Sequence, residues 1–392
     1  MRSWTAQRVS SHTDSVFEEV AALARRHNAC NLGSGTPDSP LPEALQAALS
    51  GAIAGGHNHY APVQGETVLR EAVAAHAARF YRQQVDPETE ISITSGVTEA
   101  IHAALFSIVD PGDEVIVFEP FYDCYVPCLR MAGGIPVAVT LHAPSFRFDP
   151  QELRAAFSPR TKALLLNTPH NPTGTVFSSG ELTLIAQLCQ EFDVLAITDE
   201  VYEHFVFDGA KHIRLATLPG MWERTLTLGG AGKTFSCTGW RIGWAVGPAP
   251  LHDALTRLRQ FTVFAAPTAA QFAIAAGLQF PDAYFQELAV DYQARRDYLT
   301  RALAACELKP NRPVGSFFIL IDISAFPSPN GRDFCSELAK RFGVAPVPMD
   351  TFYLHQHYGE RIVRFAYCLR HEILETAARR LAKLRVDCWN QS

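Results

Sequence analysis

Short apolar segments alternate with helical patterns through the middle of this chain, and this alternation is the strongest constraint on its fold. Continuous apolar strands separated by helices are typical of a mainly parallel sheet that is covered on both faces. The pattern therefore predicts an α/β fold whose ligand binds beyond the carboxyl ends of the strands. The seven predicted strands span residues 91–94, 114–118, 136–140, 162–166, 194–198, 225–228 and 243–246.

The two ends of the chain have other patterns. Residues 1–30 contain an arm and then an amphipathic helix, with Val16, Val20, Leu23 and Ala24 on one face. A long helix from Asp282 to about Ala305 precedes strands near 316–322 and 361–367. We therefore expect a smaller α+β domain, and 392 residues are enough for two domains.

Composition excludes several classes of protein. The net charge is −6 and there is no long run of Lys or Arg, so nucleic acid is not an expected partner. No apolar segment is long enough to span a bilayer, and the N-terminus lacks the apolar core of a secretory signal. Nine cysteines without CxxC pairs predict reduced thiols in a cytoplasmic protein, with no metal site.

Lys233 follows the apolar run 225–228 and lies among Gly, Ser and Thr. Small neighbours let the backbone approach a ligand closely, and a desolvated lysine amine can form a Schiff base with a carbonyl. Arg241, eight residues later, offers a cation for an anionic group. The alternative is a glycine-rich turn with a solvated lysine. A phosphate-binding Walker loop is excluded, because Thr227 stands where its first glycine would be.

Asp199 ends the predicted strand 194–198, so its carboxylate should lie at the ligand-binding edge of the sheet. Tyr202 follows one helical turn later and could direct its phenol into the same crevice. A buried, ionised acid needs a cationic partner, which a pyridinium nitrogen would supply. The alternative for Asp199 is a helix N-cap.

Three further segments could hold a ligand. Asn171 begins an NPTG turn after the strand 162–166, and its amide could donate to a phenolate oxygen; such a turn also needs no function. Residues 95–98 lie between a strand and a helix, where free N–H groups favour a phosphate, or where simple capping occurs. Arg364 lies inside an apolar strand and suits a carboxylate, unless it faces solvent.

Taken together and in this order, the motifs resemble the class I aminotransferases, enzymes of fold type I that depend on pyridoxal 5'-phosphate. The branch with kynurenine, glutamine and methionine aminotransferases is the most similar. The resemblance runs from about Asn31 to Leu384, and its densest matches are FEPFYD (118–123), NTPHNPTG (167–174), DEVYEH (199–204) and GKTFSCTGWRIGW (232–244). It implies an arm with part of the small domain (1–40), a large cofactor-binding domain (41–280) and a small C-terminal domain (281–392).

The resemblance also implies roles for individual residues. Lys233 would bind the cofactor aldehyde and then move the proton at the substrate Cα, while Asp199 would pair with the pyridine nitrogen. Tyr202 and Asn171 would bind the ring 3-oxygen, and Tyr122 would stack on the ring. The phosphate would be held by Gly96, Val97, Thr98, Arg241 and, from a second subunit, Tyr60, which implies a homodimer. Arg364, with Gly35 and Asn171, would bind the substrate α-carboxylate.

Two positions depart from the family pattern. Gly230 stands where the family usually has a phosphate-binding serine, so the cofactor could be bound more weakly or a water could substitute. Met349 and Asp350 stand in a loop where relatives have small residues. Asp350 could contact the substrate side chain and favour a cationic or hydroxylated substrate, or it could face solvent.

We expect a transaminase that moves the amino group of a large neutral, aromatic or sulfur amino acid to a 2-oxo acid. The apolar character of Phe121, Tyr122, Phe261 and Phe264 motivates this substrate class. Elimination, or cyclisation of a guanidino amino acid, uses the same lysine and stays an alternative. A non-catalytic ligand domain of a transcription regulator is a second alternative, which the lack of a basic DNA-binding module disfavours.

Overall fold

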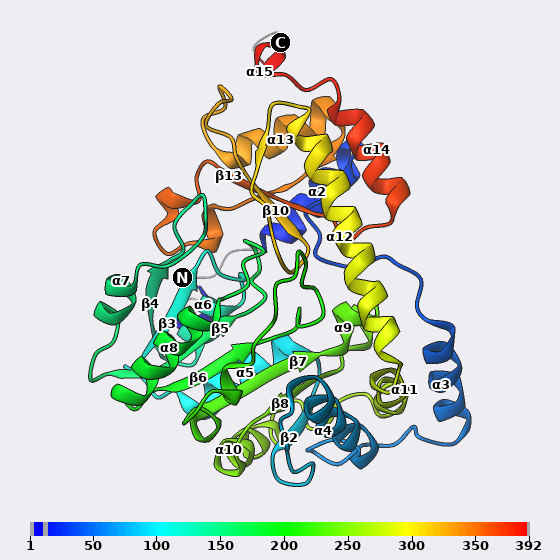
Figure 1. Ribbon diagram of the computed structural model, residues 1–392, viewed down its shortest axis with the longest axis vertical. Helices are drawn as coiled ribbons and strands as arrows, with labels where there is room; N and C mark the ends of the chain where they lie inside the picture. Colours follow the sequence, from blue (N-terminus) through cyan, green and yellow to red (C-terminus); the bar gives the residue numbers. More distant parts are fainter. Residues whose placement is uncertain (1–3, 11–14, 390–392) are drawn as a thin grey trace.

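The computed structural model describes residues 4–10 and 15–389, and a seven-stranded sheet forms its largest layer (Figure 1). The strand order is β2-β8-β7-β6-β5-β3-β4; β8 is antiparallel to β2 and β7, and the remaining neighbours are parallel. All seven predicted strands are confirmed, with ends that differ by at most two residues. They are β2 (Ile91–Thr94), β3 (Glu114–Glu119), β4 (Ile135–Thr140), β5 (Thr161–Asn167), β6 (Leu195–Asp199), β7 (Thr225–Gly230) and β8 (Gly243–Val246).

Helices cover both faces of this sheet because alternate residues of its strands point to opposite sides. Val115 and Val117 of β3 pack with the core that includes α5 (Val97–Ile108), whereas Ile116 packs with the core that includes α8 (Ser179–Glu191). Both sets are buried, which explains why these strands read as continuous apolar runs.

A second, four-stranded antiparallel sheet has the order β12-β13-β10-β9. Its two central strands are β10 (Phe318–Asp322) and β13 (Ile362–Ala366), flanked by β9 (Lys309–Pro310) and β12 (Val347–Pro348). The helices around it are α12 (Asp282–Ala304), α13 (Gly331–Phe342) and α14 (His371–Leu381). Helix α14 ends four residues before the predicted end at residue 385.

The N-terminal helix α2 (Val16–His27) lies beside this second sheet, whose strands come from the other end of the chain (Figure 1). Strand β1 (Cys30–Asn31) pairs in parallel with β11 (Val344–Ala345), which ties the two ends of the chain together. The other helices are α1 (Gln7–Ser10), α3 (Glu43–Ala54), α4 (Thr67–Tyr81), α6 (Tyr125–Met131), α7 (Pro150–Ala155), α9 (Ala231–Thr234), α10 (Ala249–Arg259), α11 (Thr268–Leu278) and α15 (Val386–Trp389). Of the described helices, none combines the length and apolarity that crossing a membrane requires.

Candidate active site

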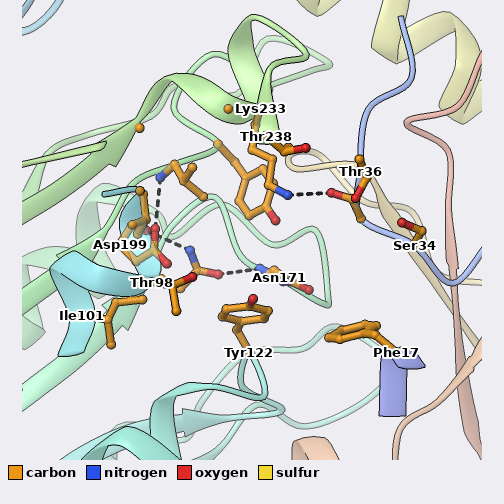
Figure 2. Close-up of a pocket in the computed structure, with 18 of the residues that line it drawn as sticks. Phe17, Ser34, Thr36, Thr98, Ile101, Tyr122, Asn171, Asp199, Lys233 and Thr238 are labelled. Atoms are coloured by element: carbon orange, nitrogen blue, oxygen red, sulfur yellow. Dashed lines mark hydrogen bonds between the residues drawn. The ribbon is translucent and has the colours of Figure 1, made fainter. Parts of the chain in front are cut away.

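The carboxyl ends of the central strands open into a cavity of about 390 Å³ (Figure 2). Asn167 ends β5, Asp199 ends β6, and β7 runs directly into the short helix α9, which carries Lys233. The cavity also receives β13 through Arg364 and the first turn of α2 through Phe17. The sequence-predicted residues that line it are Gly35, Gly96, Val97, Thr98, Tyr122, Asn171, Asp199, Tyr202, Lys233, Arg241 and Arg364.

The ε-amine of Lys233 points into this cavity and donates a hydrogen bond to the backbone oxygen of Gly35 at 2.6 Å (Figure 2). Burial, helped by the Arg364 charge and partly opposed by Asp199, lowers the pKa of Lys233 to about 8. A lysine with such a pKa has a substantial neutral fraction near physiological pH, which is the nucleophilic form.

Asp199 is 4% exposed and accepts two hydrogen bonds, from the Tyr125 hydroxyl at 2.7 Å and from the Val201 N–H at 3.2 Å. Burial raises its pKa to about 6, which the Tyr125 hydrogen bond partly opposes. No residue that the structure describes forms an ion pair with it. A buried carboxylate in this position fits a protonated ring nitrogen, because that cation would replace the lost solvation.

Arg364 is 1% exposed, yet no carboxylate among the described residues pairs with it. Its two terminal nitrogens donate to the Asn171 side-chain oxygen at 2.8 Å and the Gly33 backbone oxygen at 2.9 Å, while Nε has no partner. Burial lowers the pKa of Arg364 to about 10. The rings of Phe318, Phe17 and Phe352 surround the guanidinium, at 4.1, 5.0 and 5.4 Å from its carbon. The site therefore holds a buried cation ready to receive a carboxylate.

Three glycines shape the end of the cavity at the start of α5. A Cβ on Gly96 would lie 2.5 Å from Arg241 Nη2, and Gly96 has a φ of +79° that favours glycine. A Cβ on Gly243 would lie 2.9 Å from the Val97 nitrogen, and one on Gly230 would lie 2.8 Å from Val97 Cγ2. The glycines thus let Arg241 and the first turn of α5 pack closely at this end of the cavity, where an arginine and a helix N-terminus together fit a phosphate group. The contact with Val97 also explains why position 230 is glycine, because the Val97 side chain occupies the space that a side chain at position 230 would need.

The structure places five other predicted residues, Asp350, Phe121, Phe261, Phe264 and Tyr60, outside this cavity. The prediction that Asp350 contacts the substrate is corrected: its carboxylate pairs with Arg332 of α13 at 2.6 Å and lines a separate polar hollow. The 3₁₀ turn Asp350–Phe352 directs the side chain there. Phe121 is buried, and Phe261 is 84% exposed; neither lines the cavity, so they do not support the expected substrate class. Tyr60 is 87% exposed and lies edge-on to Phe264 at 5.5 Å; its expected role in a second subunit stays a prediction.

Sequence reasoning missed several residues that line the cavity. Tyr125 holds Asp199, and its position one helical turn after Tyr122 was an available signal. The Asn167 amide donates to the Asp199 backbone oxygen at 2.8 Å, and its oxygen accepts from the Asn171 N–H at 2.6 Å. Thr238 also lines the cavity and lies within the motif 232–244, whereas Phe17, Glu18, Ser34, Thr36, Ile101 and Phe318 line it without any motif that marks them.

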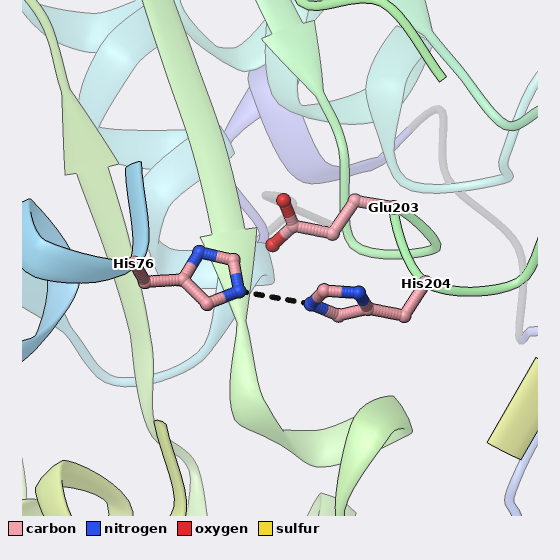
Figure 3. A group of neighbouring side chains, drawn as sticks. All are labelled: His76, Glu203 and His204. Atoms are coloured by element: carbon pink, nitrogen blue, oxygen red, sulfur yellow. Dashed lines mark hydrogen bonds between the residues drawn. The ribbon is translucent and has the colours of Figure 1, made fainter. Parts of the chain in front are cut away.

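A second group of buried titratable residues lies outside the cavity, although two of its three members, Glu203 and His204, directly follow Tyr202 in sequence (Figure 3). It contains His76, Glu203 and His204, whose side-chain nitrogens and oxygens lie within 4.8 Å of one another. The two Nε2 atoms share a hydrogen bond of 2.9 Å, shorter than the separation of about 3.3 Å that two imidazoles have on a tetrahedral zinc ion. Glu203 already pairs with Arg214 at 2.9 Å. These contacts describe an internally paired structural group.

Comparison with known proteins agrees with the geometry of the cavity. The family model for class I and II aminotransferases matches residues 27–381. The chain is 41% identical to a probable N-succinyldiaminopimelate aminotransferase, DapC, of Mycobacterium tuberculosis, over 97% of this chain and 98% of that protein. It is 39% identical to human kynurenine–oxoglutarate transaminase 1, again over 97% and 98% of the two chains.

Solved structures are similar over nearly the whole chain. The N-succinyldiaminopimelate aminotransferase of M. tuberculosis has a TM-score of 0.93 at 41% identity, covering 96% of this chain and 99% of that one. Escherichia coli YbdL, described as having a methionine aminotransferase function, has a TM-score of 0.94 at 35% identity, covering 98% and 100%. The chain therefore belongs to the class I and II aminotransferases, with the fold type I architecture and the pyridoxal 5'-phosphate dependence of that family.

Proposed function

We propose that this aminotransferase moves the amino group of a large neutral, aromatic or sulfur amino acid to a 2-oxo acid in a ping-pong cycle. The buried guanidinium of Arg364, which has no carboxylate partner among the described residues, carries the proposal, since it faces the same cavity as Lys233 and is surrounded by aromatic rings. The relatives are named for N-succinyldiaminopimelate, kynurenine and methionine, so their names leave the donor open.

In this proposal each residue has one task. Pyridoxal 5'-phosphate supplies an electron sink for the carbanion at the substrate Cα. Asp199, oriented by Tyr125, keeps the ring nitrogen protonated, and the Lys233 amine takes the Cα proton and returns it. Asn171 has its oxygen engaged by Arg364, so its amide nitrogen is the end that serves the ring 3-oxygen together with Tyr202.

The remaining residues bind and orient. Arg241, with the N-terminus of α5 at Gly96, Val97 and Thr98, holds the phosphate. The planar fork of Arg364 holds the substrate α-carboxylate in one orientation. Tyr122, whose hydroxyl has a pKa raised by burial, stays neutral and stacks on the ring. Phe17 and Phe318 exclude water from the ion pair that the carboxylate forms.

The assembly and the division of the chain belong to the same proposal. A homodimer in which Tyr60 reaches the partner's phosphate site is supported by the exposure of Tyr60 and Phe261. The division into residues 1–40, 41–280 and 281–392 is supported by the two separate sheets. A cytoplasmic location is supported by the eight described cysteine side chains, all of them free thiols.

Incubation of the cofactor-loaded protein with single amino acids and pyruvate tests the proposed reaction. We expect 2-oxo acids from methionine, glutamine, phenylalanine and kynurenine, with alanine formed in equal amount. Lys233→Ala should lower the rate by at least about 10⁴-fold, because the group that moves the Cα proton is lost. Ammonia or a cyclised guanidino product in place of alanine would instead support a lyase or a cyclase.

A further inference from the structure

The charged residues of the cavity leave one carboxylate without a task. Five charged side chains line it: Glu18, Asp199, Lys233, Arg241 and Arg364. Under the proposed function the last four serve the ring nitrogen, the aldehyde, the phosphate and the substrate α-carboxylate. Glu18 remains, and within the described part of the chain it forms no ion pair.

The position of Glu18 follows from the start of α2. Ser15 caps this helix, and its hydroxyl accepts from the Phe17 N–H at 3.3 Å. Phe17 lies at the edge of the cavity near Tyr122 (Figure 2), with its ring 5.0 Å from the Arg364 guanidinium. Glu18 is the next residue and also lines the cavity, as does Ala21 one turn later, so Glu18 lies on the face of α2 that borders the cavity.

A second carboxylate strengthens the negative charge at this place. The Ser15 hydroxyl donates to Asp123 Oδ2 at 3.3 Å, which ties Asp123 to the start of α2. Asp123 also lies close enough to Arg364 for each to shift the pKa of the other. Among the cations that line the cavity, Arg364 is the one that acts on Asp123, and the α-carboxylate of a bound amino acid would neutralise it. The charge that then faces the substrate side chain is negative.

We propose that Glu18 is a specificity-determining residue that selects against amino donors with an anionic side chain and favours neutral or cationic ones. The inference rests on the proposed function, because it takes Arg364 as the α-carboxylate site. An anionic side chain that extends from Arg364 toward α2 would meet the Glu18 carboxylate, and like charges repel in a cavity more strongly than in bulk water. Neutral and cationic side chains meet no such cost.

The adjacent Glu19 provides a matched control. It belongs to the same helical turn and is also exposed, but its carboxylate pairs with Arg332 at 2.6 Å and does not line the cavity. Glu18→Gln and Glu19→Gln change the net charge equally and keep the side-chain shape. Glu19→Gln also breaks the ion pair with Arg332, so a change of donor preference that appears only in Glu18→Gln reports the charge at the cavity.

The kinetic test compares glutamine with glutamate as donors, since the two differ only in the charge of the side chain. We expect the wild-type ratio of kcat/KM for glutamine over glutamate to fall about 3- to 5-fold in Glu18→Gln, and this change to shrink at high salt. Glu19→Gln should keep the wild-type ratio. An unchanged ratio in Glu18→Gln, or an equal fall in Glu19→Gln, overturns the inference.

A binding test separates this inference from the proposed reaction. Glutarate and its monoamide, glutaramate, differ by one charge and cannot be transaminated, and titration calorimetry of the cofactor-loaded protein measures their affinities. Glu18→Gln should narrow the preference for the monoamide about 3-fold, and Glu19→Gln should not. If no donor is transaminated but this pattern holds, the proposed reaction fails and the role of Glu18 stands; an unchanged preference in Glu18→Gln overturns the role alone.

Discussion

Asp199 and Glu203 are four residues apart and both are buried, yet they belong to two opposite kinds of polar environment. Glu203 pairs with the buried Arg214, which also pairs with Glu200 at 3.1 Å. Although burial acts to raise the pKa of Glu203, the Arg214 charge holds that pKa below its usual range. Asp199 has no ion pair among the described residues, and burial raises its pKa to about 6. Burial of a charge therefore does not mark a site by itself. A buried charge whose partner is missing does.

Arg364 gives the largest effect that can test this comparison. Arg364→Ala should lower kcat/KM about 10³-fold, because it removes the cation that would bind the substrate α-carboxylate. Among the described residues that line the cavity, Arg364 is the only buried arginine, and no described carboxylate pairs with it. Arg364→Lys should recover little, since a point charge lacks the planar fork. Steady-state kinetics with methionine measures both. Arg361→Ala, three residues earlier and bonded to the Ser328 backbone at 2.7 Å, is the control and should keep most of the activity.

The same acid-to-amide change should have opposite effects on stability in the two environments. Glu203→Gln should lower the free energy of unfolding by about 3 kcal/mol, because Arg214 loses one of two buried partners. Asp199→Asn should not lower the stability of the cofactor-free protein, since the fold already disfavours the ionised form. Denaturant unfolding of the cofactor-free variants measures both. Equal losses would mean that the two environments do not differ as described.

The environment of Asp199 should also affect how the free energy of unfolding depends on pH. The pKa of Asp199 is raised from 3.8 to about 6, so between these values the folded state binds the proton that the unfolded state has released. This group therefore reduces stability as pH rises through that window, and the reduction is complete above about pH 6. In the Asp199→Asn variant that contribution to the pH profile should vanish.

A smaller effect concerns Lys233, whose pKa is lowered from 10.5 to about 8, chiefly by burial. Below pH 8 the rate at which the cofactor-free protein takes up pyridoxal 5'-phosphate should rise about tenfold per pH unit, and it should level off above, because only the neutral amine attacks the aldehyde. Rapid-mixing absorbance measures this rate. Between pH 8 and 10.5 the unfolded chain binds a proton that the folded chain does not, so Lys233 adds stability as pH rises there. A rate that still climbs tenfold per unit above pH 9 would contradict the lowered pKa.

The sequence predicted the sheet well, for a physical reason. Strands buried on both faces, such as β3 and β5, are apolar at every position, so their limits are visible without tertiary information. The site residues after the strands could be predicted for the same reason: Asp199 directly follows one such run, and Lys233 lies shortly after another. The end of α14 at Leu381 was less visible, because the helical pattern continues beyond it.

The substrate side of the cavity could not be predicted in the same way. The loop with Asp350 does reach the site, but through Phe352, whose ring lies 5.4 Å from the Arg364 guanidinium. The Asp350 carboxylate instead pairs with Arg332, which lies 18 residues earlier in the chain. No local sequence pattern indicates this ion pair. Glu18 and Phe17 come from the opposite end of the chain and reach the cavity only because α2 packs beside α13.

The contact between positions 97 and 230 has a consequence for how this cavity can change. A side chain at Gly230 collides with Val97 Cγ2, whereas a smaller residue at position 97 beside Gly230 leaves unfilled space next to the phosphate end. A variant with only one of the two substitutions should therefore pack less well than the wild type, even if the double variant packs well. Libraries that vary one codon at a time would therefore report both positions as intolerant, and only joint variation would reveal the alternative way of closing this end of the cavity.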